Sequence, residues 1–521
     1  MLLSILALAT TGAWAQSSNA QQDLEYRELE LDPRSDDEVR WNAGFETEYY
    51  SYNNLDFRPL DESSDQRILD SDDRATFAFT GARFELGYRP DTHMDFVIAA
   101  SHRGMWGNDA VGNVNIFGGW MYFNALYTEY STGEYGEGVR FRVGRQFFRM
   151  DGVAGARDYI LADVLDMVRV DVPVGENLSF TLIPINVLST ASGNDGADFV
   201  GYIGQSTVET FNFGGDLMTR RYGGTVNLKD VGPVKATAYG FYTDVGAAGS
   251  GSDITYDGLL GNFTDNDWVA NFGIRAQASF GPITPYAHFD ASSGIDRKEV
   301  VATDVDTNGI AYGGGIRVNT TDPEEGKGGF VGEASYFDAY GPAYGEDGLQ
   351  YSHGYVGMKA QQAGGTLFNR FLGYHPTSYV SLFGVTTNPQ DMSRKSATQV
   401  VHARAGYELD MGLTFSAAWW MMSDSGFTRL DFGNLDNITP PFGYSRSEFR
   451  AQQRLGQTLG HELDLDLVYE VREGLSVYAS GAYIIPGNFQ AIPIDRVAGT
   501  NLGTPDPAAP WAAYAGTRLR F

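Results

Sequence analysis

The chain contains no cysteine, and lysine is scarce among its 37 basic residues. The absence of thiols excludes a disulfide framework, a thiolate metal site and a cysteine nucleophile. The 66 acidic residues bring the formal net charge to -29 over 521 residues. This balance argues against a nucleic-acid-binding protein, because such proteins usually present a basic surface. No run of 18 consecutive apolar residues follows the N-terminal region, so the sequence predicts no transmembrane helix.

Aromatic residues and glycine are, in contrast, abundant. The chain has 64 glycines, and 13% of its residues are aromatic and 42% hydrophobic, which is too much apolar surface for a disordered protein. A soluble chain of this length should divide into several domains. Glycine and aromatic residues nevertheless run evenly from about residue 40 to the end, without a linker rich in proline or serine. We therefore expect one continuous structural unit.

The N-terminal region has the features of a secretory targeting signal. Residues 2–15 are LLSILALATTGAWA, an apolar stretch that ends in small residues on both sides of Trp14. This A-x-A pattern is typical of a signal peptide, and the stretch is too short to span a membrane. We therefore predict a signal peptide over residues 1–15 and a flexible, polar periplasmic lead over residues 16–38. A plug, or a segment that binds a partner, is the alternative interpretation of the lead.

Strict alternation of apolar and polar residues marks the strands. In residues 268–280 apolar side chains occupy every second position from Trp268 to Phe280, and the intervening positions are polar except for Val269. Residues 41–49, 401–409 and 461–471 follow the same pattern. A period of two indicates β-strands with one apolar and one polar face, and a helical period fits none of these segments. Thirteen alternating residues exceed the usual length of a strand in a soluble protein.

The connections between strands differ in length in a regular way. Short turns are predicted at Pro90–Thr92, Pro173–Asn177, Lys229–Pro233, Gly281–Pro285, Asp322–Gly328, Asp410–Gly412 and Glu473–Gly474, and long polar stretches lie between them. Short turns at one end and long loops at the other are typical of outer-membrane barrels. The last strand alternates up to the terminal Phe521, as outer-membrane strands do.

These patterns predict an all-β fold: a transmembrane antiparallel β-barrel over residues 39–521. We count 17 to 20 strands, with residues 350–386 the hardest to divide. Because closed bacterial barrels have even strand numbers, we expect 18, with 16 as the alternative. A pair of soluble β-sandwich or propeller domains would also alternate. It would not explain the one-sided loop lengths or the missing linker.

Three segments carry a resemblance to a known family. Residues 459–489 contain a Gly-x-Glu-Leu-Asp strand, a short turn and a strand that ends in Pro-Gly and an aromatic residue; a Gly-Arg-Gln strand end is followed about twenty residues later by Asp-x-x-Arg. In these features, and in a weaker Gly373-Tyr374-His375, the chain resembles the alginate-export family of outer-membrane porins. Residues 149–158 depart from that family's pattern, which leaves the substrate open. The matching positions are Gly144, Arg145, Gln146, Asp166, Arg169, Gly460, Glu462, Asp464, Pro486 and Gly487.

The resemblance implies an 18-stranded, monomeric barrel that passes an anionic polysaccharide outwards. A periplasmic export partner would fit such a channel. Lumen-facing arginines suit such a substrate, because guanidinium binds carboxylate through a rigid fork. The same arginines could instead form cross-strand ladders with inward-facing acids that simply hold the wall together. Alternation places on the lumen face Arg83, Arg103, Arg140, Arg142, Arg275, Arg317, Arg404, Arg518 and Arg520.

The remaining signals are weak. Asp304, Asp306 and Asn308 are spaced like the first half of a calcium loop, although position twelve is a glycine and a polar extracellular loop tip is the favoured interpretation. Acidic loops could hold divalent cations against lipopolysaccharide phosphates. Apart from this loop-bound calcium we expect no cofactor. The seven histidines show no metal spacing, and no catalytic motif is present, so we expect no enzyme.

Three functions fit these patterns. The first is a channel in the outer membrane of a Gram-negative-type bacterium that passes an anionic polysaccharide or a related anionic solute. The second is a general or nutrient-specific porin for small solutes. The third is a non-transporting surface barrel with acidic, adhesive loops. The partners expected are outer-membrane lipid, lipopolysaccharide and the solute itself, with no nucleic acid.

Overall fold

The fold is taken from a computed structural model of the chain. The structure describes the residues of the main strands and of several short connections. These residues are 38–53, 75–105, 120–134, 137–150, 161–189, 218–245, 267–296, 305–321, 328–340, 343–344, 350–352, 354–355, 357–358, 364–371, 398–424, 458–472, 474–487 and 509–521. The predicted signal peptide, the lead and the Gly373–His375 segment lie outside them and stay predictions.

These residues form one sheet of 21 strands, antiparallel except where the short β12 and β16 pair in parallel. Three strands have only two or three residues: β12 (Val305–Asp306), β15 (Ala343–Tyr344) and β16 (Gln350–Ser352). The other 18 strands are ten residues or longer. They are β1 (Glu38–Asn53), β2 (Ala75–Asp91), β3 (Met94–Met105), β4 (Trp120–Ser131), β5 (Arg140–Arg149), β6 (Ala162–Val174), β7 (Leu178–Ser189), β8 (Met218–Val231), β9 (Val234–Val245), β10 (Asp267–Ala278), β11 (Ile283–Asp296), β13 (Gly309–Asn319), β14 (Phe330–Ala339), β17 (Thr398–Glu408), β18 (Leu413–Asp424), β19 (Thr458–Arg472), β20 (Leu475–Pro486) and β21 (Trp511–Arg520).

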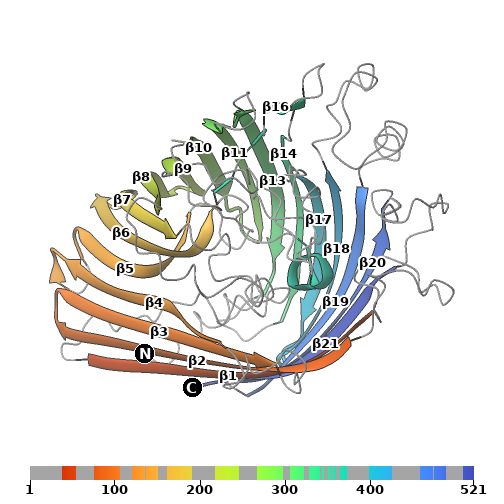
Figure 1. The fold of residues 1–521 in the computed structure, drawn as a ribbon. Coiled ribbons are helices and arrows are strands. Elements are labelled where there is room, and N and C mark those ends of the chain that lie inside the picture. The colour runs from red at the N-terminus through yellow and green to blue at the C-terminus, as the bar shows by residue number, and fades with distance from the viewer. Residues whose placement is uncertain are drawn as a thin grey trace.

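The sheet closes on itself. Each long strand pairs with the next long strand along the chain, and β1 also pairs with β21, from Gly44 opposite Arg520 to Asn53 opposite Trp511 (Figure 1). The predicted 18-stranded barrel is therefore confirmed, and both the 16-stranded alternative and the pair of soluble domains are wrong. Within the described residues, no helix is long and apolar enough to cross a membrane.

The short turns lie together at one end of the barrel. Strands β8 and β9 join through Gly232, β10 and β11 through Gly281, and β17 and β18 through Gly412, and all three glycines have positive φ values. The other end carries the long connections, such as the one between Asn53 and Ala75. This arrangement agrees with the one-sided loop lengths predicted from the sequence.

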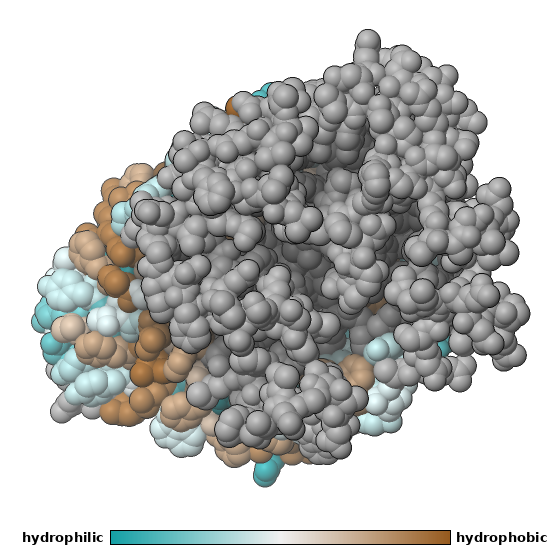
Figure 2. Space-filling view, viewed as in Figure 1, coloured by the Kyte–Doolittle hydropathy of each residue, from teal (hydrophilic) through white to brown (hydrophobic). Residues whose placement is uncertain are grey.

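The barrel wall has apolar side chains on its outer face and polar side chains on its inner face, the reverse of a soluble protein. On β10, Phe272 and Ile274 are exposed on the outside, whereas Asn271, Arg275 and Gln277 are buried on the inside. Apolar side chains gather on the outer wall, visible in brown at the left of Figure 2, over the wall that β3–β7 form in Figure 1. An outer surface of exposed aliphatic and aromatic side chains is the lipid-facing band of a transmembrane barrel.

One segment that follows β14 folds into the barrel. Residues Thr366–Phe371 form a π-helical turn, η6, inside the wall formed by β17–β20 (Figure 1). Leu367 and Phe368 are buried there and belong to the same hydrophobic cluster as the inward-facing Trp420 and Met422 of β18. Trp420 stacks on His402 of β17, with the two ring centroids 3.7 Å apart, so this apolar side chain is packed against a neighbour on the inner face.

Candidate functional site

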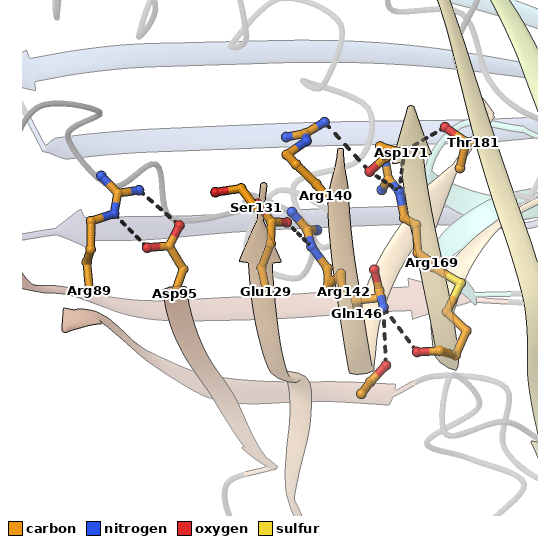
Figure 3. Close-up of polar contacts among 12 residues, drawn as sticks. Arg89, Asp95, Glu129, Ser131, Arg140, Arg142, Gln146, Arg169, Asp171 and Thr181 are labelled. Carbon is orange, nitrogen blue, oxygen red and sulfur yellow. Dashed lines mark hydrogen bonds and ion pairs between the residues drawn. The ribbon is translucent and has the colours of Figure 1, made fainter. Parts of the chain in front are cut away.

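A line of arginine–carboxylate pairs crosses the inner wall from β2 to β7 (Figure 3). It begins with Arg89 of β2 and Asp95 of β3, whose side chains meet in a two-bond fork of 2.6 Å and 2.9 Å. Inward-facing charged groups are normally paired, and the planar guanidinium matches the carboxylate geometry. This first pair therefore fixes the orientation of both side chains at the short-turn end of the wall.

The second pair lies one strand further. Arg142 of β5 donates from Nε to Oε2 of Glu129 on β4, at 2.7 Å. The guanidinium carbon of Arg142 also lies 4.4 Å from the centre of the Tyr127 ring. Both charged side chains are buried. The cation–π contact and the hydrogen bond together hold this guanidinium flat against the wall.

Asp171 on β6 forms the third group, and two arginines share it. Its carboxylate accepts a hydrogen bond from Arg169 Nε at 3.0 Å and another from Thr181 at 2.7 Å. Arg140 Nη2 lies 3.6 Å from the same carboxylate, and its side chain is 38% exposed. Two guanidiniums therefore face one carboxylate, and the more exposed of them has N–H groups directed to the lumen.

Gln146 sits beside this line on β5. It is fully buried and donates from Nε2 to the carbonyl oxygens of Gly144 and Met167 (Figure 3). These bonds keep the amide against the backbone of β5 and β6. Gln146 is thus part of the wall behind the arginines and does not reach into the lumen as they do.

The other arginines predicted from alternation are distributed around the barrel. Arg83 contacts Glu85, Arg275 lies 4.0 Å from Asp290, Arg317 lies 3.8 Å from Glu333, Arg404 donates to Ser416, and Arg518 contacts Glu46. Arg520 is exposed at the end of β21, and the side chain of Arg103 lies outside the described residues. The pairs on β2–β7 are brought together in one line, whereas these remaining arginines are not.

The wall across the barrel is acidic, but the folded segment covers it. Glu462 of β19 accepts hydrogen bonds from the backbone N–H groups of Gly365, Leu367 and Phe368. Asp464 accepts one from the N–H of Thr366 at 2.9 Å. The first N–H groups of a helical turn have no partner within the turn, so they bind carboxylates well. These two acids therefore hold the segment and are not open to a solute.

The segment approaches β19 so closely that only glycine fits at one position. A Cβ atom on Gly365 would lie 1.8 Å from a carboxylate oxygen of Asp464. Glu462 and Asp464 matched the family motif in the sequence, and their partner could not be seen there. The partner is about a hundred residues away along the chain, in a segment with no strand pattern.

The remaining motif positions have structural places. Gly460 pairs with Pro486 where β19 and β20 meet the long loops, next to Gly487. Gly144 has a φ of 127°, and a Cβ there would lie 2.2 Å from the carbonyl oxygen of Leu126. Arg145 and Asp166 contact one another on the outer face of the barrel, away from the lumen.

The candidate calcium residues give no further support for a site. Asp304 lies outside the described residues, Asp306 is exposed on β12, and Asn308 accepts a hydrogen bond from Ser293. No group of three metal-ligating side chains occurs among the residues that the structure describes. Calcium binding by this loop stays a prediction.

The sequence did not single out several members of the line. Arg89, Asp95, Glu129 and Asp171 were not named as site residues, although each lies on the inner phase of its strand. The alternation that identified Arg140 and Arg142 applies equally to them. The signal was therefore available, but it does not show which inward charges become neighbours.

Comparisons with known proteins match the fold. No protein-family model and no curated protein sequence matches the chain. A solved structure, Pseudomonas aeruginosa OccD3 (OpdP), is similar with a TM-score of 0.50 at 11% identity, covering 97% of this chain and 98% of that chain. Two further structures from this organism match less well: OccK8 (OprE), with a TM-score of 0.46, 10% identity and coverage of 93% and 98%, and the outer membrane protein OprD, with 0.45, 11% and coverage of 93% and 94%.

The similarity to OccD3 shows the fold, a closed 18-stranded barrel over nearly the whole of both chains. It gives no separate support to the resemblance with alginate-export porins, which stays a prediction based on short motifs.

Proposed function

We propose that this protein is an outer-membrane channel of the porin type that passes small anionic solutes, with carboxylates as the favoured class. The closed barrel with an apolar outer band supports the location. A barrel of 18 strands is wide enough to enclose a channel rather than a filled core. The OprD match agrees with this placement, since that protein is described as an outer membrane protein.

The observation that carries the proposal is the sharing of Asp171 by Arg140 and Arg169. One carboxylate balances two guanidiniums, so this part of the wall has an excess positive charge. Arg140 is the partly exposed member, and its 3.6 Å contact with Asp171 is longer than a hydrogen bond. A solute carboxylate can therefore bind Arg140 without displacing the wall's own ion pair.

The surroundings strengthen this charge. Fixed cations in a low-dielectric wall focus the potential in the space that they face. On the opposite wall, the negative charges of Glu462 and Asp464 are directed at the backbone N–H groups of residues 365–368. Glu462 and Asp464 therefore do not neutralise, from across the lumen, the excess positive charge on β5 and β6.

We favour small solutes over a polysaccharide because the folded segment occupies part of the barrel interior. Residues 364–368 are buried, and the segment contacts β19, β20 and β21 on the inner face of the wall. A polymer requires a continuous path along its whole length, whereas a small carboxylate needs only successive binding positions. Polysaccharide export and the adhesive surface barrel are therefore kept as outcomes of the test.

The test is the reversal potential of the purified protein in a planar bilayer with a potassium chloride gradient. We expect a preference for chloride over potassium, and a reduced current when glucuronate is added. A cation preference would overturn the proposal. Block by polyuronate at concentrations where glucuronate has no effect would favour polysaccharide passage. No conductance, even after the long loops are deleted, would favour the surface barrel.

A further inference from the structure

An ion pair lies on the outer, lipid-facing wall of the barrel. Arg145 of β5 and Asp166 of β6 are directly opposite each other in the sheet. Their side chains form a fork with 2.9 Å from Nε to Oδ1 and 2.6 Å from Nη2 to Oδ2. The two side chains are 43% and 48% exposed. They belong to neither the lumen nor the arginine line on the inner wall.

The strand phase places this pair outside. Along β5, Phe141 and Val143 are exposed on the same face as Arg145, whereas Arg142 and Gln146 are buried on the other. On β6, Leu165 and Met167 are buried on the inner face, and Asp166 between them is exposed. Both charged groups therefore stand among side chains that face lipid.

The pair is also near the middle of the membrane. Each residue of the pair has a residue directly opposite it on the next strand, and this residue has one on the strand after. Followed in this way, the row of opposite residues runs from Arg145 to Trp41 on β1 and from Asp166 to Trp268 on β10. Trp41 lies at the short-turn end and Trp268 at the long-loop end, as in the two aromatic belts of a transmembrane barrel. The residues between are Leu86, Ile98 and Leu126 on one side and Val187, Arg220 and Asp244 on the other.

Strands in such barrels are tilted, so this line of paired residues climbs from one belt to the other. Arg145 is four strands from Trp41, and Asp166 is four strands from Trp268. The ion pair is therefore at half height. Charged groups on the lipid face are most unfavourable at this depth, where no water or headgroup can solvate them.

We propose that this patch is the contact between two copies of the chain in the membrane. The ion pair joins neighbouring strands, so its charge separation runs around the barrel. When two copies are related by a two-fold axis along the membrane normal, the left side of one patch faces the right side of the other, and each residue keeps its depth in the membrane. Arg145 of each copy then faces Asp166 of the other, and four charges alternate in a ring. An isologous contact needs such a self-complementary surface.

The surrounding side chains fit this occupant. Val143 and Leu126 are exposed beside the pair, and Ile98 is exposed one strand further. They form an exposed apolar surface on the Arg145 side of the charged pair, where a second copy can pack. A lipid phosphate would carry charge to Arg145 but would repel Asp166, and it lies about 15 Å away at the edge of the hydrocarbon core.

The test uses the absence of native cysteine. A Val143→Cys variant of the full chain carries one thiol, close to the proposed axis. A nitroxide is attached to it, and distances between labels are measured in phosphatidylcholine vesicles at high dilution. A short distance is expected. The control is Phe415→Cys, exposed on β18, halfway round the ring of strands, where no short distance is expected. No short distance for Val143→Cys would overturn the proposal.

A second set of variants separates the contact from folding. In Arg145→Met with Asp166→Leu, the charges are replaced by apolar groups that lipid tolerates, so the barrel should insert and conduct as before. The Val143 label should report dimerisation weakened roughly tenfold or more. Undiminished dimerisation in this variant would overturn the role of the pair. Arg145→Asp and Asp166→Arg should each fail to self-associate, but a mixture of the two should form mixed dimers.

Discussion

Glu46 of the first strand and Arg518 of the last strand form an ion pair of 3.0 Å across the seam where the barrel closes. The two residues are directly opposite each other in the sheet, and both side chains are almost completely buried. Tyr478 on β20 donates a hydrogen bond to the same carboxylate. The seam is thus held by side chains from three strands as well as by the backbone ladder.

Arg518→Met should destabilise the barrel. The substitution leaves the Glu46 carboxylate with Tyr478 but without its cation, and we expect a loss of about 1–3 kcal/mol in the free energy of unfolding. Guanidinium unfolding in vesicles, followed by tryptophan fluorescence, measures the change. Arg520→Met is the matched control, since Arg520 is exposed at the end of the same strand. Equal losses in both variants would contradict a specific role for the seam pair.

Gly365→Ala should release the folded segment from β19. The new Cβ would lie 1.8 Å from a carboxylate oxygen of Asp464, so the segment must move away from the two carboxylates. We expect larger and noisier single-channel currents, because part of the lumen is freed. Gly481→Ala on β20 is the control, since a Cβ there meets no atom within 4 Å. Unchanged currents for Gly365→Ala would show that the segment does not narrow the path.

Glu462→Gln tests the same contact between the folded segment and β19, with the change made on the strand. The amide keeps the size of the side chain but loses the charge that attracts three backbone N–H groups. The expected phenotype is the same increase in current noise as in Gly365→Ala. The double variant should show no further increase, because both substitutions release one contact. Additive effects would indicate two independent sites.

Arg140→Gln should lower the preference for anions. It removes one charge near the solute path without breaking a buried hydrogen bond, so folding should be unaffected. We expect the ratio of chloride to potassium permeability to fall about twofold, as for one charge at a short distance in a watery lumen. Arg404→Gln makes the same charge change on β17 and should have a smaller effect. The reversal potential in a salt gradient measures both.

Block by carboxylates should depend strongly on salt. The attraction between Arg140 and a solute acts through water, where the screening length falls from about 10 Å at 0.1 M to about 3 Å at 1 M ionic strength. Glucuronate should therefore reduce the current clearly at 0.1 M potassium chloride and hardly at 1 M. Block that is independent of salt would indicate a steric obstruction instead.

Much of the fold could be predicted because it depends on local pattern. A strand with one face in lipid and one in the lumen must alternate, as from Trp268 to Phe280, and a one-residue shift would reverse every side chain. The alternation of β5 also fixes opposite faces for Arg142 and Arg145. The inner position of Arg142 was predicted from this rule, whereas Arg145 was considered only as part of a motif, so the outer position of its ion pair was missed.

Contacts between a strand and a distant segment, and the choice of side-chain partners between strands, could not be predicted, because no pattern within one strand indicates them. Glu462 was expected as an inward acid, but its partners belong to a segment without strand alternation. Trp420 is an apolar side chain on the inner face, where it stacks on His402 of β17. The sharing of Asp171 by two arginines likewise depends on side-chain reach between strands, and strand phase alone does not give it.

The seam also has a consequence for biogenesis. Glu46 and Arg518 are 472 residues apart, so the sheet stays open at both edges until the final strand has been synthesised. Open edges present unpaired backbone groups, which attract other strands, and contacts of such long range form slowly. The chain must therefore be shielded from aggregation until β21 pairs with β1, because only that pairing removes the two open edges.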